Sequence, residues 1–564
     1  MKIRPLIVYL AALSLALTAC VGGTSEEQDA GKVNGDPTTV NSGTAQAGTG
    51  DVKVAVAAAP TNWNVATPTG NSVVTEYLAS LIMPAAFISQ PDWTLKINED
   101  LLVSADVTAN DPQTVEYVIN PDAKWSDGTP INAKDFVYTW QVQNGKDCAD
   151  CQINAIGGYG SIASVEGADD GKRVIVKFSE TYGEWQSLFK FIFPSHIAAK
   201  HGTLKESFDT FFAQTVPEWS GGPLKLSDYI KDESINLVPN EAWYGDKPNL
   251  KTVNIRIITD QAQWPTALAN GEISMMATEP TTDLVAELDN MTPQGFKYQL
   301  SPGNRLVWLG VNMKDPKWQN KALREAVMTA IDMESVIDRT VGQFADFVKP
   351  SRSLVYLPNQ PGYTDSMKAA GVDYGSGNVE AATKMLTDAG YEIKDKKLYA
   401  PDGNPVPDIK IVTYRRLAFE NIARATVDDL RAIGVNAQMV ADPSPFGNYV
   451  IPGNYDFSLL NWSMVPFSAS KASTSWTSKA NSTGFKSAEV DDSIFKAMRT
   501  VDPAEATSAL QAGDRLLLES STAMPFFQLP SVFGYQGDLV NVRDNPSLNS
   551  GPTYNVVDWG IKAE

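Results

Sequence analysis

The chain has 564 residues and is acidic, with 66 Asp and Glu against 46 Lys and Arg and a formal net charge of −20. This balance argues against a nucleic-acid partner, which needs a basic surface, and against docking on anionic lipid through protein charge alone. Two His and three Cys rule out most His-based metal sites and any disulfide-dense scaffold.

The N-terminus has the pattern of a secretory signal. Lys2 and Arg4 precede an uncharged apolar run over residues 6–19, which is shorter than the roughly 20 residues of a membrane span. The run ends in Leu-Thr-Ala-Cys20, which resembles the lipobox of bacterial lipoproteins. The resemblance implies a signal peptide over residues 1–19 and a lipidated Cys20. The alternative is an ordinary signal peptide with a chance cysteine.

Residues 21–50 are rich in Gly, Thr, Ser, Asn and Asp and contain no aromatic residue. Such a segment buries too little apolar surface to offset its ordering entropy. We therefore predict a flexible tether over residues 20–50, with a reach of about 30 Å. The protein is then expected on the extracytoplasmic face of the cell membrane, held by lipid only.

The body of the chain alternates predicted strands with predicted helices. Residue patterns predict strands at 51–57, 114–119, 174–178, 234–238, 253–258, 306–311, 409–412, 435–440 and 457–462. They predict helices at 73–82, after the capping residue Asn132, and at 261–270, 322–341, 379–389, 418–433 and 507–519. This alternation predicts an α/β fold with substantial parallel sheet.

Cys148 and Cys151 form a C-x-x-C pair. Such a pair can be redox-active, half of a zinc site, or a disulfide across a small loop. A second cysteine pair for zinc is missing, and no thioredoxin-like strand precedes the motif. We expect a structural disulfide, because the signal sequence directs the chain out of the cytoplasm.

Motifs of catalysis are missing from the sequence. It contains no G-x-S-x-G elbow, no P-loop and no HExxH. His196 and His201 are five residues apart, so on a helix they do not converge on one metal. We expect no enzyme activity, no cofactor and no metal site.

The segment from Lys124 to Trp140, KWSDGTPINAKDFVYTW, resembles the signature of family 5 extracellular solute-binding proteins. These are the oligopeptide-, dipeptide- and nickel-binding lipoproteins of ABC importers. Companion motifs follow in the family's order: PNEAWYG at 239–245, ALANGEIS at 267–274, GVN at 310–312 with ALREA at 322–326 and AID at 330–332, ATKML at 382–386 with AGY at 389–391, and DL at 429–430 with IGV at 433–435. The chain is identified on these motifs as a member of this family, of actinobacterial type.

The resemblance implies a two-lobed fold like that of periplasmic binding proteins, of class II and with an extra inserted domain. Mapped onto this chain, lobe 1 takes residues 51–86, 220–305 and 524–564, the inserted domain takes 87–219, and lobe 2 takes 306–523. The chain would cross between the lobes near 305 and 524, so hinge residues are expected there.

The resemblance also implies where a ligand binds. In peptide-binding members a Trp ends a strand, and an Asp three residues later holds the α-amino group of the ligand. Here the Trp is Trp462 and the Asp position is Val465, which cannot accept from an ammonium group. A ligand without a cationic head, read by hydroxyl groups such as that of Ser463, fits this sequence better.

Other candidate ligand-binding residues come from family positions near the cleft. They are Asn304, Arg305 and Trp308 near the interlobe crossing, Thr278 and Glu279 in lobe 1, Asn62 and Trp63 in the first loop, and Tyr414 and Arg415 at the end of a lobe 2 strand. Structural alternatives remain open for these residues: a core aromatic at Trp462, a hinge salt bridge at Arg305, a turn at Trp63 and helix capping at Arg415.

Two function classes follow from the resemblance. One is a monomeric substrate-binding lipoprotein that captures a peptide or peptide-like solute between closing lobes and delivers it to an ABC permease and its ATPase. The other is a regulatory or signalling lipoprotein of the same fold that acts in cell-envelope lipoglycan synthesis. Genomic neighbours would distinguish the two classes.

Overall fold

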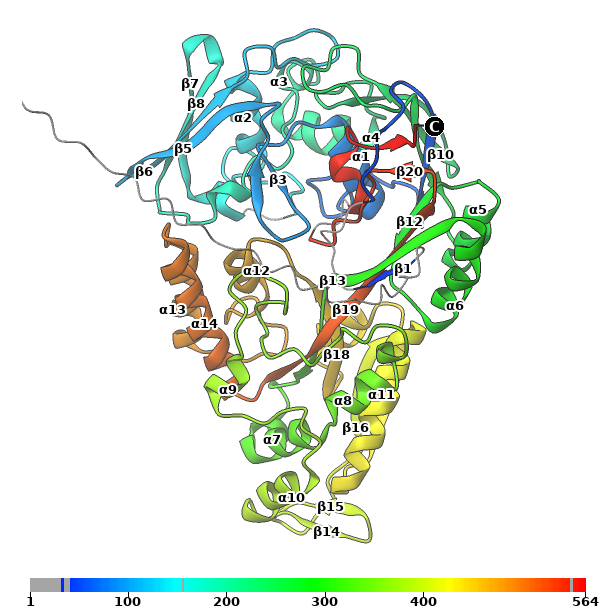
Figure 1. Ribbon diagram of the computed structural model, residues 1–564. Coiled ribbons are helices and arrows are strands. Elements are labelled where there is room, and N and C mark those ends of the chain that lie inside the picture. Colours follow the sequence, from blue (N-terminus) through cyan, green and yellow to red (C-terminus); the bar gives the residue numbers. More distant parts are fainter. Residues whose placement is uncertain (1–31, 35–40, 155–156, 548–550, 564) are drawn as a thin grey trace, which may run out of the picture.

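The computed structural model describes residues 32–34, 41–154, 157–547 and 551–563 (Figure 1). The predicted signal peptide, Cys20 and most of the predicted tether lie outside the described residues. Within those ranges, no helix is both long and apolar enough to cross a bilayer.

One large mixed sheet runs through the molecule. Its strands follow the order β17-β16-β18-β13-β19-β12-β2-β11-β10-β9, and β1 also pairs with β13. They are β1 Lys32–Asn34, β2 Asp51–Val56, β9 Leu224–Ile230, β10 Ser234–Pro239, β11 Thr252–Ile257, β12 Met275–Thr278, β13 Phe296–Val311, β16 Ile409–Tyr414, β17 Ala437–Asp442, β18 Phe457–Ser463 and β19 Ala523–Gln536. The sheet contains parallel pairs, such as β2 with β11, and antiparallel pairs, such as β13 with β19. The predicted parallel pairing therefore describes only part of this sheet.

Smaller sheets and the helices make up the rest of the described structure. A four-stranded antiparallel sheet, β5-β6-β8-β7, stands beside the large sheet, with two-stranded pairs elsewhere. These strands are β3 Phe87–Ser89, β4 Leu95–Ile97, β5 Leu102–Asn110, β6 Gln113–Ile119, β7 Ile162–Ala168, β8 Arg173–Phe178, β14 Glu392–Lys394, β15 Lys397–Tyr399, β20 Leu539–Val540 and β21 Gly560–Ile561. The α-helices are α1 Val73–Ile82, α2 Ala133–Gln141, α3 Ser195–Ala198, α4 Phe212–Gln214, α5 Trp264–Ala269, α6 Thr282–Met291, α7 Lys321–Ala330, α8 Met333–Asp338, α9 Ser366–Ala370, α10 Val379–Asp388, α11 Leu417–Leu430, α12 Ser468–Ser475, α13 Ala488–Met498 and α14 Pro503–Glu519.

The buried apolar residues form two large cores, which define two lobes. The core of lobe 1 joins residues from 52–257 with residues from 533–559, and the core of lobe 2 uses residues between 307 and 529. The long antiparallel strands β13 and β19 run from one lobe into the other (Figure 1). Their register shifts between Pro302 and Arg305, opposite 529–530.

The division of the chain proposed from its sequence stays a prediction, and the cores lead us to adjust it at one point. Leu529 packs in the core of lobe 2, whereas Val532 packs in a smaller core under α5 and α6. We therefore propose the second crossing near residue 530 rather than 524. Residues 87–219 carry their own antiparallel sheet, yet they share the core of lobe 1.

The prediction of one helix over residues 322–341 is wrong. Helix α7 ends at Ala330, because Ile331 adopts an extended backbone with φ −70° and ψ 128°. The Asp332 side chain then caps α8 by accepting from the Ser335 amide at 2.9 Å, while the Asp332 amide donates to Asp429 at 3.0 Å. Apolar spacing continued across the break because both helices pack on the same core.

The predicted flexible tether is too long. Residues 41–50 lie against lobe 1, where Ala45 pairs with Lys562 and the Asn41 side chain donates to the Leu539 carbonyl at 2.7 Å. A side chain at Gly43 would meet Val540 at 2.5 Å. Glycine therefore serves close packing here, although composition alone indicated a coil.

Candidate functional site

A cavity of about 400 Å³ lies between the two lobes. Its polar lining residues in lobe 1 are Asn71, Glu76, Gln143, Asn154, Tyr159, Tyr182, Ser187 and Lys190, and in lobe 2 they are Asn304, Ser463, Ser470, Lys471, Ser473 and Thr474. Apolar walls come mainly from Val65, Leu188, Phe191, Val465, Phe467 and Met498. Both lobes thus contribute walls, and the volume suits a small solute.

The charged groups of the cavity are few. Lys190 donates to the two carboxylate oxygens of Glu76 at 2.8 and 3.1 Å, so these charges offset each other. Lys471 on α12 has its ammonium 4.8 Å from the centre of the Trp462 ring. Burial lowers the pKa of Lys471 to about 8.

A loop of lobe 1 also reaches across to lobe 2. The Glu184 carboxylate accepts from the amides of Ala469 and Ser470, at 2.9 and 2.8 Å, in the first turn of α12. The Tyr182 hydroxyl lies 2.8 Å from that of Ser470. The carboxylate is favourably placed at the positive end of the helix, so this contact holds the lobes together at one edge of the cavity.

Three of the predicted ligand-binding residues line the cavity. Asn304 and Ser463 present polar groups, and Val465 presents an apolar wall. The Val465 carbonyl also accepts from the Gln360 side chain at 3.0 Å, which holds this loop in place.

The two predicted tryptophans lie deeper than expected. Trp308 is 0% exposed and stacks on Trp462, with ring centroids 5.5 Å apart, so the prediction that Trp308 contacts ligand is wrong. It points into the core of lobe 2, where it also meets Trp476. Trp462 is partly buried and lies next to Lys471, with its ring facing the ammonium group. This position fits the alternative that Trp462 is an aromatic residue of the core.

Thr278, Glu279, Arg305 and Tyr414 lie at the interlobe crossing, outside the residues that line the cavity. Glu279 at the end of β12 forms ion pairs with Arg305 and, at 3.5 Å, with Arg416. The Arg416 guanidinium lies over the Tyr414 ring, 5.2 Å from its centre. The structure therefore shows an ion pair for Arg305, the structural alternative that the sequence left open, and its place at a hinge stays a prediction.

Asn62, Trp63 and Arg415 also lie apart from the cavity lining. Asn62 donates to Thr69 at 2.9 Å, and Trp63 packs edge-on against Tyr229 at 4.9 Å, so both belong to a structural turn. Arg415 is exposed and donates to the Ala441 carbonyl at 3.3 Å.

Sequence reasoning missed Lys471, Tyr182, Glu184 and the Glu76–Lys190 pair. None of these residues belongs to a motif, and they come from segments far apart in the chain. One signal was available: Lys471 is the nearest basic residue after Trp462 and falls among the serines of a helical segment.

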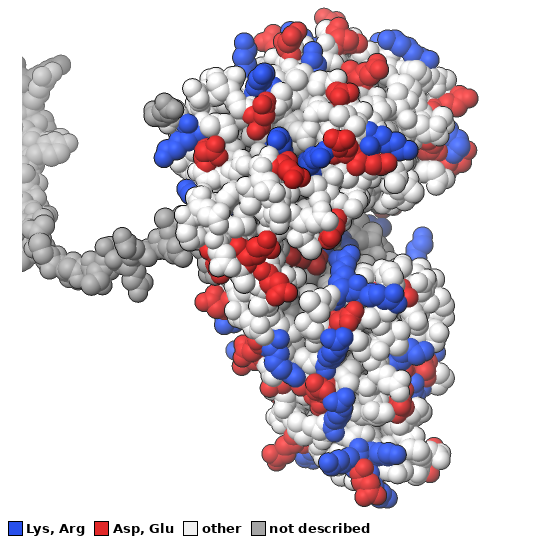
Figure 2. Space-filling model, turned by 90° about the vertical axis from the view of Figure 1, so that its right-hand side faces the viewer, with Lys and Arg blue, Asp and Glu red and all other residues white. Residues whose placement is uncertain are grey.

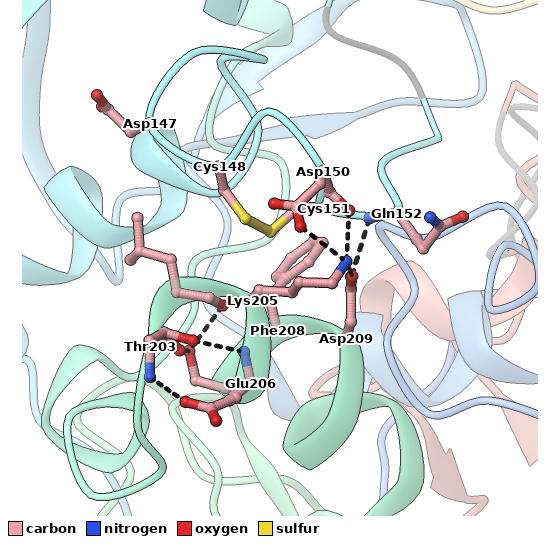
Figure 3. Close-up of a disulfide and its surroundings, with 12 residues drawn as sticks. Asp147, Cys148, Asp150, Cys151, Gln152, Thr203, Lys205, Glu206, Phe208 and Asp209 are labelled. Carbon is pink, nitrogen blue, oxygen red and sulfur yellow. Dashed lines mark hydrogen bonds and ion pairs between the residues drawn. A yellow bond between two sulfur atoms is a disulfide. The ribbon is translucent and has the colours of Figure 1, made fainter.

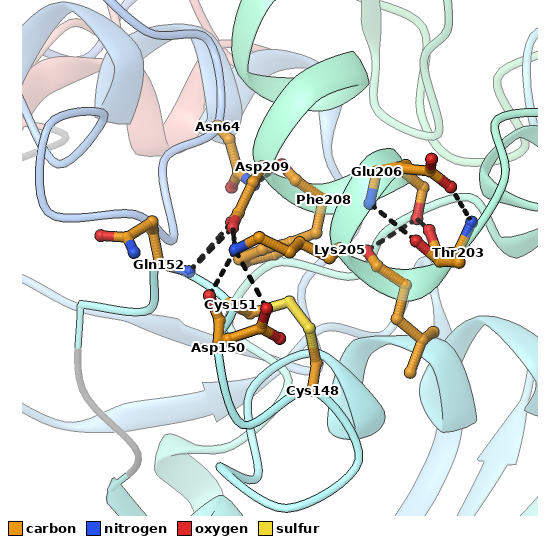
Figure 4. A network of polar contacts seen from close by, with 12 residues as sticks. Asn64, Cys148, Asp150, Cys151, Gln152, Thr203, Lys205, Glu206, Phe208 and Asp209 are labelled. Atoms are coloured by element: carbon orange, nitrogen blue, oxygen red, sulfur yellow. Dashed lines mark hydrogen bonds and ion pairs between the residues drawn. A yellow bond between two sulfur atoms is a disulfide. The ribbon is translucent and has the colours of Figure 1, made fainter.

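Cys148 and Cys151 are joined by a disulfide, with their Cα atoms 5.3 Å apart (Figure 3). The following residue is held by Asp209, which accepts from the Gln152 amide at 2.9 Å and from Lys205 at 2.9 Å (Figure 4). Lys205 also donates to the Asp150 carbonyl. The disulfide therefore fixes a loop against the neighbouring helical segment, outside the cavity lining.

Replacing both cysteines by serine is expected to lower the free energy of unfolding by about 2 kcal/mol, because the closed loop is short. Thermal unfolding with and without a reductant measures this loss. Ligand affinity should stay unchanged, and a loss of binding in the double variant would contradict a purely structural role.

The chain has no metal cluster among its described residues, since no group of three or more His, Cys, Asp or Glu is placed to hold an ion. On the face shown in Figure 2, acidic and basic side chains are interspersed over both lobes, and the surface narrows at their junction.

Comparisons with known proteins agree with this geometry. The family model described as bacterial extracellular solute-binding proteins, family 5, matches residues 96–484. The chain is 37% identical to the solved structure of the periplasmic EDTA-binding protein EppA, with a TM-score of 0.89 over 94% of this chain and 99% of that one. It is 26% identical to the oligopeptide-binding protein OppA of Mycobacterium tuberculosis, over 93% of this chain and 85% of that protein. The probable monoacyl phosphatidylinositol tetramannoside-binding protein LpqW of the same species is 26% identical over 69% of this chain and 64% of its own length.

Proposed function

Since the chain belongs to the bacterial extracellular solute-binding proteins of family 5, a family of non-enzymatic binding proteins, we propose that it is the substrate-binding lipoprotein of an ABC importer. A small solute enters the cavity between the lobes and favours their closed arrangement, because only that arrangement surrounds it. The closed protein then presents the solute to a permease. The observation that carries this proposal is the cavity walled by both lobes. Lipid on Cys20 would keep the protein at the membrane.

The solute we propose is peptide-like or otherwise small, and it lacks a cationic head. Val465 stands where the resemblance places the Asp that holds the α-amino group in peptide-binding members, and it is one of the residues that line the cavity. OppA supports a peptide, whereas EppA supports a compound rich in carboxylates. Both kinds of solute carry at least one carboxylate.

Similarity to LpqW supports a second candidate, a regulatory lipoprotein of the same fold acting in cell-envelope lipoglycan synthesis. Its ligand would be a glycolipid head group rather than an imported nutrient. Neighbouring permease and ATPase genes favour import, and neighbouring envelope glycosyltransferase genes favour this second role.

Native mass spectrometry of the chain from residue 21, purified gently, tests the proposal. Fragmentation of the released solute identifies it. A peptide series or a single small metabolite supports import. A cavity that stays empty against mixtures of peptides and small solutes, but fills with a glycolipid head group, would favour the regulatory role.

A further inference from the structure

Lys471 is the one charged group of the cavity lining without an ionic partner among the described residues. It comes from the first turns of α12, and its ammonium faces the Trp462 ring at 4.8 Å. A cation over an aromatic face is stabilised by about 0.5–2 kcal/mol, which is less than a carboxylate partner or full hydration provides. The site is thus built around an incompletely compensated positive charge.

The nearby carboxylates are already engaged. Glu76 binds Lys190 within the cavity, and Glu184 binds the α12 amides at its edge. Glu279 is engaged at the hinge with Arg305. The lining therefore keeps one net positive charge inside a protein whose total charge is −20, so that charge is available to a ligand.

The loss of hydration around Lys471 also favours an anionic ligand. Burial disfavours the ammonium form of Lys471 and lowers its pKa to about 8. A ligand anion would supply the missing compensation and raise this pKa again. A cationic ligand would meet repulsion from the same group.

The other lining residues indicate which groups the ligand carries besides its anionic group. The Ser463 hydroxyl and the Asn304 side-chain amide offer hydrogen bonds, and Phe467 and Met498 offer apolar walls. The Ser470 hydroxyl is already bonded to Glu184 and Tyr182. One ammonium compensates one carboxylate of the ligand, and the ligand's other polar groups face the hydrogen-bonding part of the lining.

We propose that Lys471 is the anion-binding residue of this cavity and that the ligand presents a carboxylate to it. This inference rests on the proposed function, since it assigns the chemistry of the same interlobe cavity. Ser463 and Asn304 then bind the polar remainder of the ligand. The carboxylate belongs either to a small polycarboxylate or to the C-terminus of a peptide.

The test uses the full chain in mild detergent and calorimetric titration with EDTA, N-acetyltrialanine, N-acetyltrialanine amide and glycerophosphoinositol, so that neither peptide probe carries an ammonium group. Lys471→Met should weaken binding of the carboxylate ligand about 20-fold. Lys479→Met is the matched control, because Lys479 is exposed and outside the cavity lining, and it should leave affinity unchanged. Binding of EDTA identifies a polycarboxylate, and binding of N-acetyltrialanine but not its amide identifies a peptide terminus.

The pH dependence of ligand affinity gives a second measurement, which would not change if Lys471 had a purely structural role. Affinity should fall about tenfold between about pH 7 and pH 9 as Lys471 loses its proton, and Lys471→Arg should bind with a flat profile. Glu184, Tyr182 and the Glu76–Lys190 pair also face this region from lobe 1, and any dependence that survives in Lys471→Arg belongs to them.

The outcomes separate this inference from the proposed function. Equal affinities of the Lys471→Met and Lys479→Met variants, or preference for N-acetyltrialanine amide, overturn the inference and leave solute capture standing. If glycerophosphoinositol binds and none of the carboxylate probes does, the proposal that the ligand is a carboxylate is overturned, and the regulatory role is favoured. If the protein neither carries nor binds any solute, the proposed function fails together with the inference.

Discussion

Replacing Asp135 by alanine is expected to destabilise the region around the signature segment by about 3–5 kcal/mol. Asp135 is 1% exposed and accepts from the Asn132 amide at 3.0 Å, the Trp125 indole at 3.3 Å and the Ser195 amide at 2.8 Å. Its removal leaves these buried donors without an acceptor, which costs more than one ordinary hydrogen bond.

Hydrogen exchange of the α2 amides measures this loss, because it reports local opening without assuming two-state unfolding of a large protein. Asp122→Ala is the matched control, since Asp122 lies in the turn before the same segment and is exposed. Its effect should stay within about 0.5 kcal/mol. Equal protection in both variants would contradict the central role of Asp135.

Replacing Glu184 by alanine is expected to weaken ligand binding about 100-fold. The carboxylate joins the lobes through the Ala469 and Ser470 amides and the Ser470 hydroxyl. Charge-assisted hydrogen bonds of this kind contribute about 2–3 kcal/mol in total after the cost of burying the carboxylate. Without them the open arrangement gains population, and apparent affinity falls with the closed fraction.

Calorimetry gives the affinity, and small-angle X-ray scattering of the unliganded protein gives the accompanying increase in radius of gyration. Glu180→Ala is the matched control, because Glu180 also bridges the lobes, through Arg499 at 3.2 Å, but both side chains are about 60% exposed. An exposed pair contributes little, so this control should bind nearly as well as the unmodified protein. A Glu184→Ala protein with the same affinity and radius as the control would show that the contact does not stabilise closure.

Much of the local structure could be predicted from the sequence. The helix at 73–82 has the predicted bounds, and Asn132 caps α2 through the predicted box with Asp135. These features depend on residues close together in the chain, where periodicity, capping and turn chemistry act directly. The family also followed from the sequence, since its motifs are local segments in a fixed order.

The candidate site needed the tertiary structure, because its walls come from segments such as 71–76, 182–190 and 463–471, which only folding brings together. The strand containing Trp308 was predicted, but the direction of its side chain depends on the pairing of β13 with β18 and on the packing of Trp308 against Trp462 and Trp476. The sequence left both a ligand contact and an ion pair open for Arg305, and only the folded structure places Glu279 beside it. The sequence by itself determined most of the elements and the family, and the role of Val465 stays a prediction. Only the tertiary structure decided that Lys471 has no ionic partner among the described residues, because that depends on which carboxylates other residues have already engaged.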